Sequence, residues 1–198
     1  MTATATVGVL ALQGDFQEHC TALRGLGVSV TEVRRADQLD AIDALIIPGG
    51  ESTSMAKLMD AYGMRVPLQT FAASGRPTWG TCAGLILLAS RLAEDRPEPL
   101  GLMDIAVQRN GFGRQVDSFE TELDIAGVQG GPVHAVFIRA PLILETGSDV
   151  QTLASLADGT AVVVRQGHLL ASAFHPELTG DARMHRYFVE MLPVGASP

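Results

Sequence analysis

A cysteine flanked by small residues, in Gly80-Thr81-Cys82-Ala83-Gly84, follows a short apolar run and precedes an apolar helical pattern. Glycines permit the sharp strand-to-helix turn that projects a nucleophile into open space. The positive end of the following helix favours the thiolate, which is the reactive form of cysteine. The backbone N–H of Ala83 is then available to an oxyanion. The pattern therefore predicts that Cys82 is a nucleophile, and a buried structural cysteine is the alternative.

A base for this thiol is expected from another part of the chain, in Phe174-His175-Pro176-Glu177. An apolar run predicts a strand over His168 to Phe174, and the carboxyl ends of parallel strands gather at one edge of a sheet. His175 is therefore expected at the same edge as Cys82, as its base. Glu177 can accept a hydrogen bond from the imidazole and fix its tautomer, which is the role of a third triad member.

The other histidines and the second cysteine lack a comparable context. No other histidine has a carboxylate two residues beyond it after a strand, and no pair has metal-site spacing with a third ligand nearby. We therefore predict no metal site. A lone histidine is usually a surface residue or a satisfied core residue, and a cysteine on the apolar stripe of a helix is core packing. This interpretation covers His19, His134, His168, His185 and Cys20.

Two adjacent glycines follow the third apolar run, in Pro48-Gly49-Gly50-Glu51-Ser52-Thr53. They allow a close backbone approach to a ligand, and their amides could complete an oxyanion hole. A helix expected from Ser52, with Ser52 or Thr53 as its N-cap, offers further donors to a carboxylate. The competing hypothesis is a nucleotide phosphate loop, but neither G-x-G-x-x-G nor G-x-x-x-x-G-K-[ST] occurs. A plain strand-to-helix turn remains the alternative.

Arginines stand in two further places where a ligand could bind. The polar, glycine-punctuated segment from Arg109 to Gln115 contains Arg109 and Arg114, and Arg139 directly follows an apolar run. An arginine can bind a carboxylate in a two-pronged fashion, as an amino-acid substrate requires. The alternative is that these are surface arginines without a special role.

The bulk composition narrows the classes of function. The chain has 198 residues, of which 46% are hydrophobic, and a net charge of −8. This length and composition predict one domain over residues 1–198, with loose tails at about 1–6 and 194–198. Clustered Lys and Arg are absent, so we expect no nucleic-acid partner, and no stretch of about 18 apolar residues predicts a membrane span. Two cysteines and no secretory signal indicate a cytoplasmic protein.

The hydrophobic pattern predicts strands that alternate with helices, and this order is typical of an α/β fold with a parallel sheet and right-handed crossovers. The second half of the chain is richer in strands. Strands are predicted over residues 7–12, 28–33, 44–47, 77–80, 102–108, 118–125, 133–138, 151–156, 161–165 and 168–174. Helices are predicted over residues 15–26, 52–62, 67–73, 85–89 and 181–191.

These motifs together resemble a known family. The segments Gly80 to Gly84 and Phe174 to Glu177 resemble the signature of class I glutamine amidotransferases. The combination of further stretches is similar to the glutaminase subunits of pyridoxal 5′-phosphate synthase, the PdxT family, from about Val7 to Leu192. Those stretches are Leu12-Gln13-Gly14, Glu18-His19, Pro48 to Thr53, Arg109 to Phe119 and Phe137-Ile138-Arg139-Ala140-Pro141.

The resemblance implies a fold and a site. The fold would be a flavodoxin-like three-layer α/β/α domain with a mostly parallel sheet. L-glutamine would be hydrolysed to L-glutamate and ammonia through a thioester on Cys82, with no cofactor. Gly49 and Gly50 would shape the oxyanion hole beside Ala83. The glutamine contacts carried over by the resemblance are Gly50, Glu51, Ser52, Arg109, Ile138 and Arg139.

The resemblance also implies a partner. It would be the synthase subunit (PdxS), a barrel that uses the ammonia to build the vitamin B6 cofactor, and Gln13 would lie at the junction with it. Ammonia would be channelled to this subunit, and the full assembly would contain twelve copies of each subunit.

Three other hypotheses remain to be separated from this one. A cysteine hydrolase of similar fold, such as a PfpI-like protein, places its histidine directly after the nucleophile, whereas Ala83 follows Cys82 here. A non-catalytic flavodoxin-like interaction module would leave the placement of Cys82, His175 and Glu177 to coincidence. A glutaminase that serves another synthase, such as that of the imidazole glycerol phosphate pathway, is disfavoured only by the resemblance.

Overall fold

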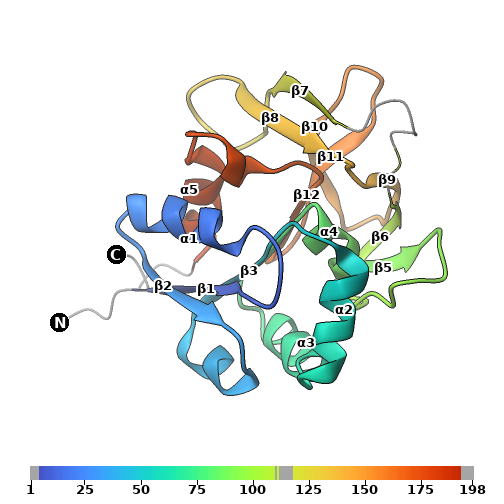
Figure 1. Cartoon of the computed structure of the whole chain (residues 1–198). Helices are drawn as coiled ribbons and strands as arrows, with labels where there is room; N and C mark the ends of the chain where they lie inside the picture. Colours follow the sequence, from blue (N-terminus) through green and yellow to red (C-terminus); the bar gives the residue numbers. More distant parts are fainter. Residues whose placement is uncertain (1–4, 110, 112–117, 193–198) are drawn as a thin grey trace.

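A seven-stranded sheet runs through the centre of the molecule (Figure 1). The computed structural model describes residues 5–109, 111 and 118–192. The strands follow the order β10-β11-β12-β4-β3-β1-β2 across the sheet. Their bounds are Thr6–Leu10 (β1), Ser29–Val33 (β2), Ala44–Ile47 (β3), Thr78–Thr81 (β4), Gln151–Ser155 (β10), Ala161–Gln166 (β11) and Leu169–Ser172 (β12).

Five neighbouring strands of this sheet are parallel, in the order β2-β1-β3-β4-β12. If β12 is counted as the fifth strand, this is the 2-1-3-4-5 order of flavodoxin-like folds. β11 and β10 then extend the sheet in antiparallel fashion. The predicted fold class, a flavodoxin-like α/β domain with a mostly parallel sheet, is therefore confirmed.

Helices cover both faces of the sheet and give the three layers (Figure 1). Helices α1 and α5 lie over one face, while α2 and α3 lie on the opposite side. α4 follows β4 and packs against α2, β3 and β12. The helices are Phe16–Gly25 (α1), Ser52–Ala61 (α2), Arg65–Ala73 (α3), Ala83–Leu88 (α4) and Arg183–Glu190 (α5), with short 3-10 turns at Ala36–Ala41 (η1) and Pro176–Leu178 (η2).

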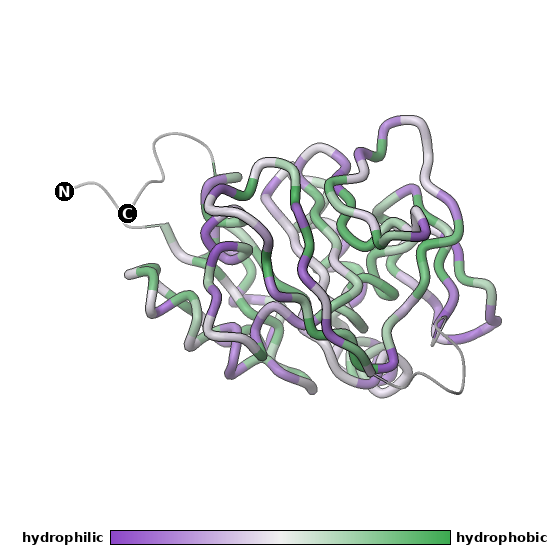
Figure 2. The backbone as a smooth tube through the Cα atoms, turned by 90° about the horizontal axis from the view of Figure 1, so that it is seen from above, coloured by the Kyte–Doolittle hydropathy of each residue, from purple (hydrophilic) through white to green (hydrophobic). Residues whose placement is uncertain are grey.

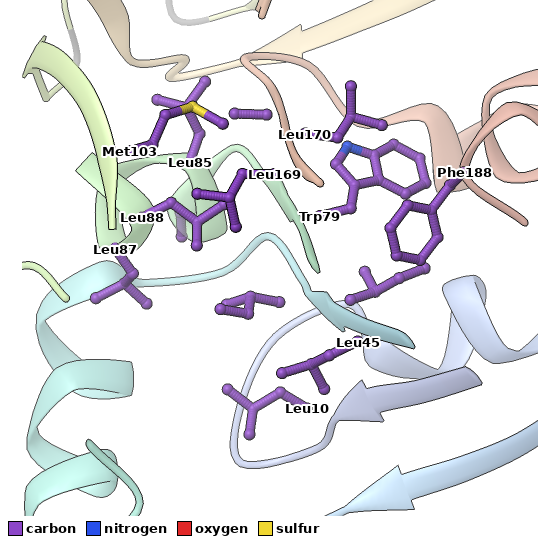
Figure 3. Close-up of a cluster of buried hydrophobic side chains, with 14 of the residues drawn as sticks. Leu10, Leu45, Trp79, Leu85, Leu87, Leu88, Met103, Leu169, Leu170 and Phe188 are labelled. Atoms are coloured by element: carbon purple, nitrogen blue, oxygen red, sulfur yellow. The ribbon is translucent and has the colours of Figure 1, made fainter. Parts of the chain in front are cut away.

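The central strands are buried on both faces because helices cover each side. Every residue of β3, β4 and β12 is buried. β3 is apolar throughout, as expected of such a strand, whereas threonine and serine stand at the ends of β4 and β12. Figure 2 shows how hydrophobic and hydrophilic positions alternate along the backbone, and Figure 3 shows Trp79 of β4 beside Phe188 of α5 in the core. Burial of such large side chains is the main favourable contribution to folding.

Two smaller sheets stand beside the central one. β5 (Ala89–Leu92), β6 (Met103–Gln108) and β9 (Leu142–Thr146) form one, and β7 (Ser118–Leu123) pairs with β8 (Val133–Ile138) in the other. The sequence analysis missed β5 and β9. Both are short, mix apolar with charged or polar residues, and are stabilised by pairing with β6 rather than by their own pattern.

Some predicted boundaries were wrong. Ala89 begins β5 and does not end the preceding helix. The predicted N-terminal tail reaches too far, because Ala5 is buried and Thr6 begins β1, where its N–H donates to Asp43. The rest of the predicted tails, residues 1–4 and 194–198, lies outside the described residues. Among the residues described, no helix is both long and apolar enough to cross a membrane.

The turn after β4 packs closely against the end of β3. A Cβ added at Gly84 would overlap the carbonyl oxygen of Ile47, and one at Gly80 would meet the backbone of Gly84. The two glycines therefore let α4 approach the sheet closely enough to place Cys82 at its edge.

We expect Gly84→Ala to destabilise the fold by about 3 kcal/mol, because the added methyl group meets backbone atoms that cannot move aside. Urea unfolding would measure this change. Gly25→Ala is the matched control: it ends α1, a Cβ there meets nothing, and alanine is the better helix former. Equal stability of the two variants would contradict the close packing of Gly84.

Candidate active site

Cys82 lies between the end of β4 and the start of α4, as the sequence predicts. Its backbone has φ 46° and ψ −101°, a region that a residue with a side chain rarely adopts. Such a conformation costs about 1–3 kcal/mol, so the surrounding structure must hold it. The Cys82 N–H donates to the carbonyl of Ser172 at 2.9 Å, which ties the turn to the end of β12.

His175 follows β12 and reaches the same edge of the sheet. Its backbone N–H donates to the carbonyl of Val136 in β8 at 2.8 Å, and only 5% of the residue is exposed. The imidazole Nδ1 lies 2.7 Å from Oε1 of Glu177, which is itself buried in η2. A carboxylate accepts only, so Nδ1 carries the proton and Nε2 remains for other partners. The three residues predicted as a triad are thus brought together.

Electrostatic interactions keep this histidine charged. Burial alone lowers the pKa of His175, but interactions with Cys82 and Glu177 outweigh it and raise the pKa to about 10. Burial raises the pKa of Glu177, and the hydrogen bond and charge of His175 partly offset this effect. A charged imidazolium beside Cys82 stabilises the thiolate, the form of the side chain that attacks an electrophile.

A cavity of about 510 Å³ opens in front of Cys82 and His175. This size suits a small-molecule ligand. The six residues predicted to contact glutamine all line it, and so do Ala83 and the predicted partner contact Gln13. Those six are Gly50, Glu51, Ser52, Arg109, Ile138 and Arg139. Three separate segments of the chain contribute these six residues, which converge on one cavity.

The double-glycine turn packs directly on the catalytic edge. A Cβ at Gly49 would overlap the His175 ring, and Gly50 has a φ of +147°, which favours glycine. The carbonyl of Gly49 accepts a hydrogen bond from the Asp15 N–H at 3.1 Å. The Glu51 N–H donates to Oε1 of Gln13 at 2.9 Å. The turn is therefore held in place by the segment that precedes α1.

Glu51, and not Ser52 or Thr53, is the N-cap of α2, so the predicted cap was wrong. Its carboxylate accepts hydrogen bonds from the N–H groups of Thr53 and Ser54. Burial alone raises the pKa of Glu51, but hydrogen bonds from Ser54 and Thr53 outweigh it and lower the pKa to about 2. Propensity favours Ser or Thr at this position, yet the longer Glu51 side chain reaches the same amides, while Ser52 is buried at the cavity wall.

Two arginines stand at the cavity, one fixed and one at a strained backbone position. Nη2 of Arg109 lies 3.2 Å from Oε1 of Glu51, and Nη1 donates to the carbonyl of Arg96. Arg139 follows β8 with a positive φ of 43°, which points to a position constrained by its surroundings. Arg114, the third arginine singled out from the sequence, lies outside the described residues.

Sequence reasoning missed Asp15, which lines the cavity. It precedes α1 as the N-cap, but its side chain makes no capping hydrogen bond, and Oδ2 lies 3.5 Å from Nδ1 of His175. An aspartate before a helix normally indicates an N-cap. The sequence therefore gives no signal that distinguishes a capping Asp15 from one that contacts His175. Asp15, His175 and Glu177 could also be read as metal ligands, but Nδ1 of His175 carries a proton for Glu177 and offers no lone pair.

Comparison with known proteins decides the family. Residues 9–194 match the family described as the SNO glutamine amidotransferase family. The chain belongs to this family. Glutamine hydrolysis, which the resemblance implied, is therefore the family's chemistry, and the chain is a glutaminase. Membership argues against both a PfpI-like hydrolase and a non-catalytic module.

Individual relatives of the family agree with this placement. Proteins named pyridoxal 5′-phosphate synthase subunit PdxT are 59% identical in Herpetosiphon aurantiacus and 55% identical in Dehalococcoides mccartyi, each over 187 residues. The alignments cover 93% of this chain and 98% and 96% of those proteins, respectively. A crystal structure described as a glutamine amidotransferase has a TM-score of 0.88 and 49% identity, and the match covers 93% of this chain and 97% of that one.

Gly49→Ala is expected to lower glutaminase activity by about 100-fold while the fold is kept, because the methyl group displaces the His175 ring. Glutamate release and the melting temperature would be measured together. Gly180→Ala, where a Cβ meets nothing, is the control and should remain active. Full activity in Gly49→Ala would show that the ring position at this edge does not matter.

Glu177→Gln is expected to move the basic limb of the pH profile of kcat/KM to lower pH by about one unit or more. Glu177 helps to raise the pKa of His175 to about 10, so its neutralisation lowers that pKa and the imidazolium is lost at lower pH. Glutamate release across the alkaline range measures the shift, with the exposed Glu18→Gln as control. A reduced rate with an unmoved basic limb would argue against this electrostatic role of Glu177.

Proposed function

We propose that Cys82, His175 and Glu177 form the catalytic triad of the glutaminase subunit of a pyridoxal 5′-phosphate synthase. The observation that carries the proposal is geometric. A thiol on a strained strand-to-helix turn lies at the same sheet edge as a histidine that is hydrogen bonded at 2.7 Å to a buried carboxylate. The names of the relatives support the biosynthetic assignment.

The chemistry begins with attack of the Cys82 thiolate on the side-chain carbonyl carbon of L-glutamine. The N–H of Ala83, together with the amides of Gly49 and Gly50, would stabilise the oxyanion of the tetrahedral intermediate. His175 donates its proton to the leaving nitrogen, so ammonia departs and a thioester forms on sulfur. His175, now neutral, takes a proton from water, and the resulting hydroxide attacks the thioester. Glutamate leaves and the thiolate is restored.

Substrate binding uses charged groups of both signs that line the cavity. The guanidinium groups of Arg109 and Arg139 suit the α-carboxylate of glutamine. Glu51 remains anionic at neutral pH, because its pKa is about 2, and suits the α-ammonium group. Backbone groups of Gly50, Ser52 and Ile138 complete the wall. This arrangement selects a zwitterionic amino acid whose side chain points to Cys82.

The partner would be the synthase subunit PdxS, docked over the mouth of the cavity in an assembly of twelve copies of each subunit, in the cytoplasm. Gln13 supports this position, since it lines the cavity and accepts a hydrogen bond from the Glu51 N–H. A contact at Gln13 would therefore act on the turn that carries Gly49 and Gly50. Ile138 and Leu178, which also line the cavity, are exposed apolar residues that a partner could cover.

The test is glutamate release from L-glutamine by the wild-type chain and by Cys82→Ala, each with and without the synthase subunit. We expect strong activity only for the wild type with the synthase, and a loss of at least about 1,000-fold in Cys82→Ala. Cys20→Ala is the matched control, since the other free cysteine is buried in the core and should be dispensable for activity.

The outcomes separate the parts of the proposal. Residual activity of Cys82→Ala close to that of the wild type would remove the nucleophile assignment. Stimulation by a different synthase, and not by this one, would favour a glutaminase of another pathway. No hydrolysis by the folded wild-type chain under any condition would overturn the assignment as a whole.

A further inference from the structure

A closed polar cluster lies behind the triad, inside the core. It joins His19 of α1, Thr81 at the end of β4 and His185 of α5, and all three are completely buried. The imidazole of His19 packs edge-on against Trp79 and tilts against His185. The sequence analysis interpreted both histidines as ordinary surface or core residues, and the mechanism above uses neither.

His19 contacts three polar groups at once. Its Nδ1 lies 2.9 Å from Nε2 of His185, and its Nε2 lies 3.1 Å from Oγ1 of Thr81. The same Nε2 lies 3.4 Å from Oε2 of Glu177. That oxygen is buried and has no hydrogen bond of standard geometry, whereas the other oxygen of Glu177 binds His175. His19 is therefore the ring that faces the back of the triad carboxylate.

The pattern of contacts assigns the proton positions. A carboxylate oxygen that faces a bare ring nitrogen is repelled, so Nε2 of His19 must carry the hydrogen toward Glu177 and Thr81. Nδ1 of His19 is then an acceptor, and it receives the hydrogen of Nε2 of His185. Nδ1 of His185 is left as a buried acceptor without a partner. The reverse assignment would leave Oε2 of Glu177 opposite a lone pair.

Both rings are neutral in this arrangement. Burial lowers the pKa of His19 well below its usual value, and the charges of His185 and His175 act in the same direction. Burial lowers the pKa of His185 to about 4, against a weaker opposing effect of Asp181. A neutral ring with one fixed N–H group acts as a directional donor and does not add a second positive charge beside His175.

We propose that His19 is a positioning residue for glutamine hydrolysis, which orients Glu177 by an N–H···O interaction from behind and links it to Thr81, the residue before the nucleophile. Glu177 then meets a ring nitrogen on both sides, through a hydrogen bond from His175 at Oε1 and a longer contact of 3.4 Å with His19 at Oε2. Together these contacts restrict the rotation of the carboxylate, which helps to hold the His175 ring in the orientation needed at Cys82. The inference rests on the proposed triad.

Core packing alone does not account for this choice of residue. A buried imidazole must find hydrogen-bond partners, and an unsatisfied polar atom costs about 1–3 kcal/mol. Here Nδ1 of His185 has no partner among the described residues, so the cluster carries such a cost. An apolar ring of similar size would fill the space between Trp79 and α5 without it. The polar pair is explained if its N–H group serves Glu177.

Four variants test the proposal in the assay in which the wild type is active. His19→Leu removes the donor, whereas the amide of His19→Gln reaches about as far as Nε2 does. His19→Asn keeps an amide that reaches only about as far as Nδ1 and cannot serve Glu177. Phe188→Leu is the packing control, because Phe188 lies against Trp79 in the same cluster and has no polar atom (Figure 3).

We expect kcat of His19→Leu and His19→Asn to fall by about 10- to 100-fold with KM for glutamine within about twofold, since no glutamine contact changes. His19→Gln should recover most of kcat, and Phe188→Leu should retain it at a comparable loss of melting temperature. Equal kcat in Gln, Asn and Leu variants, or a similar loss in Phe188→Leu, would overturn the positioning role. Where His19→Leu does not fold, the Gln and Asn variants decide.

A second readout separates this inference from the proposed function. The rate of Cys82 alkylation by iodoacetamide at neutral pH, followed on the Cys82 peptide by mass spectrometry, needs neither glutamine nor a partner. Alkylation should slow in His19→Leu and His19→Asn and recover in His19→Gln. Unchanged alkylation in all three variants would contradict the inference. A wild type that does not hydrolyse glutamine would contradict the proposed function alone.

Discussion

The parallel pairing of β4 with β12 is the constraint on which the rest of the site depends. Thr81 pairs with Ser172, so the two strands end at the same level, and the next N–H, that of Cys82, still donates to Ser172. Residues 93 positions apart in the chain thereby enter the same few ångströms of space. Without this register the nucleophile and His175 would leave the sheet at different depths. A slip by one residue would also turn every side chain of the strand to the opposite face.

That register tolerates a strained nucleophile because the turn is fixed from several directions. α4 packs on β3 through Gly84, and the backbone of His175 is held by β8. The cost of the positive φ at Cys82 is small beside the burial of the apolar residues of α4 and the central strands. The same strain exposes the sulfur to the cavity and leaves the following amide free. The tightly packed turn at Cys82 therefore both fixes the backbone and presents the reactive sulfur.

The central strands could be predicted from their apolar runs, because strands that helices cover on both faces are rich in apolar residues. The triad could be predicted for a related reason: Cys82 directly follows the buried strand β4, and His175 and Glu177 lie within five residues of the end of the buried strand β12. β5 and β9 could not be predicted in this way, because they form strands by pairing with β6 and their own composition does not favour a strand. The cap of α2 was misassigned because Glu51 reaches two amides that Ser52 was expected to serve. The local sequence pattern does not predict a helix cap made by a long side chain, nor a strand that forms only by pairing with a distant one.

The buried histidines illustrate this limit most clearly. His19 and His185 are 166 positions apart, and neither has a carboxylate two residues beyond it after a strand, the pattern that marked His175. Their relation to the site arises only when α1 and α5 pack on the same face of the sheet, behind β4 and β12 (Figure 1). A triad carboxylate buried in a protein core needs donors on both of its oxygens, and one base can serve only one of them. In this structure Oε2 of Glu177 has no hydrogen bond of standard geometry, and His19 of the helical layer lies 3.4 Å from it. The positioning role proposed for His19 assigns the second donor to this ring.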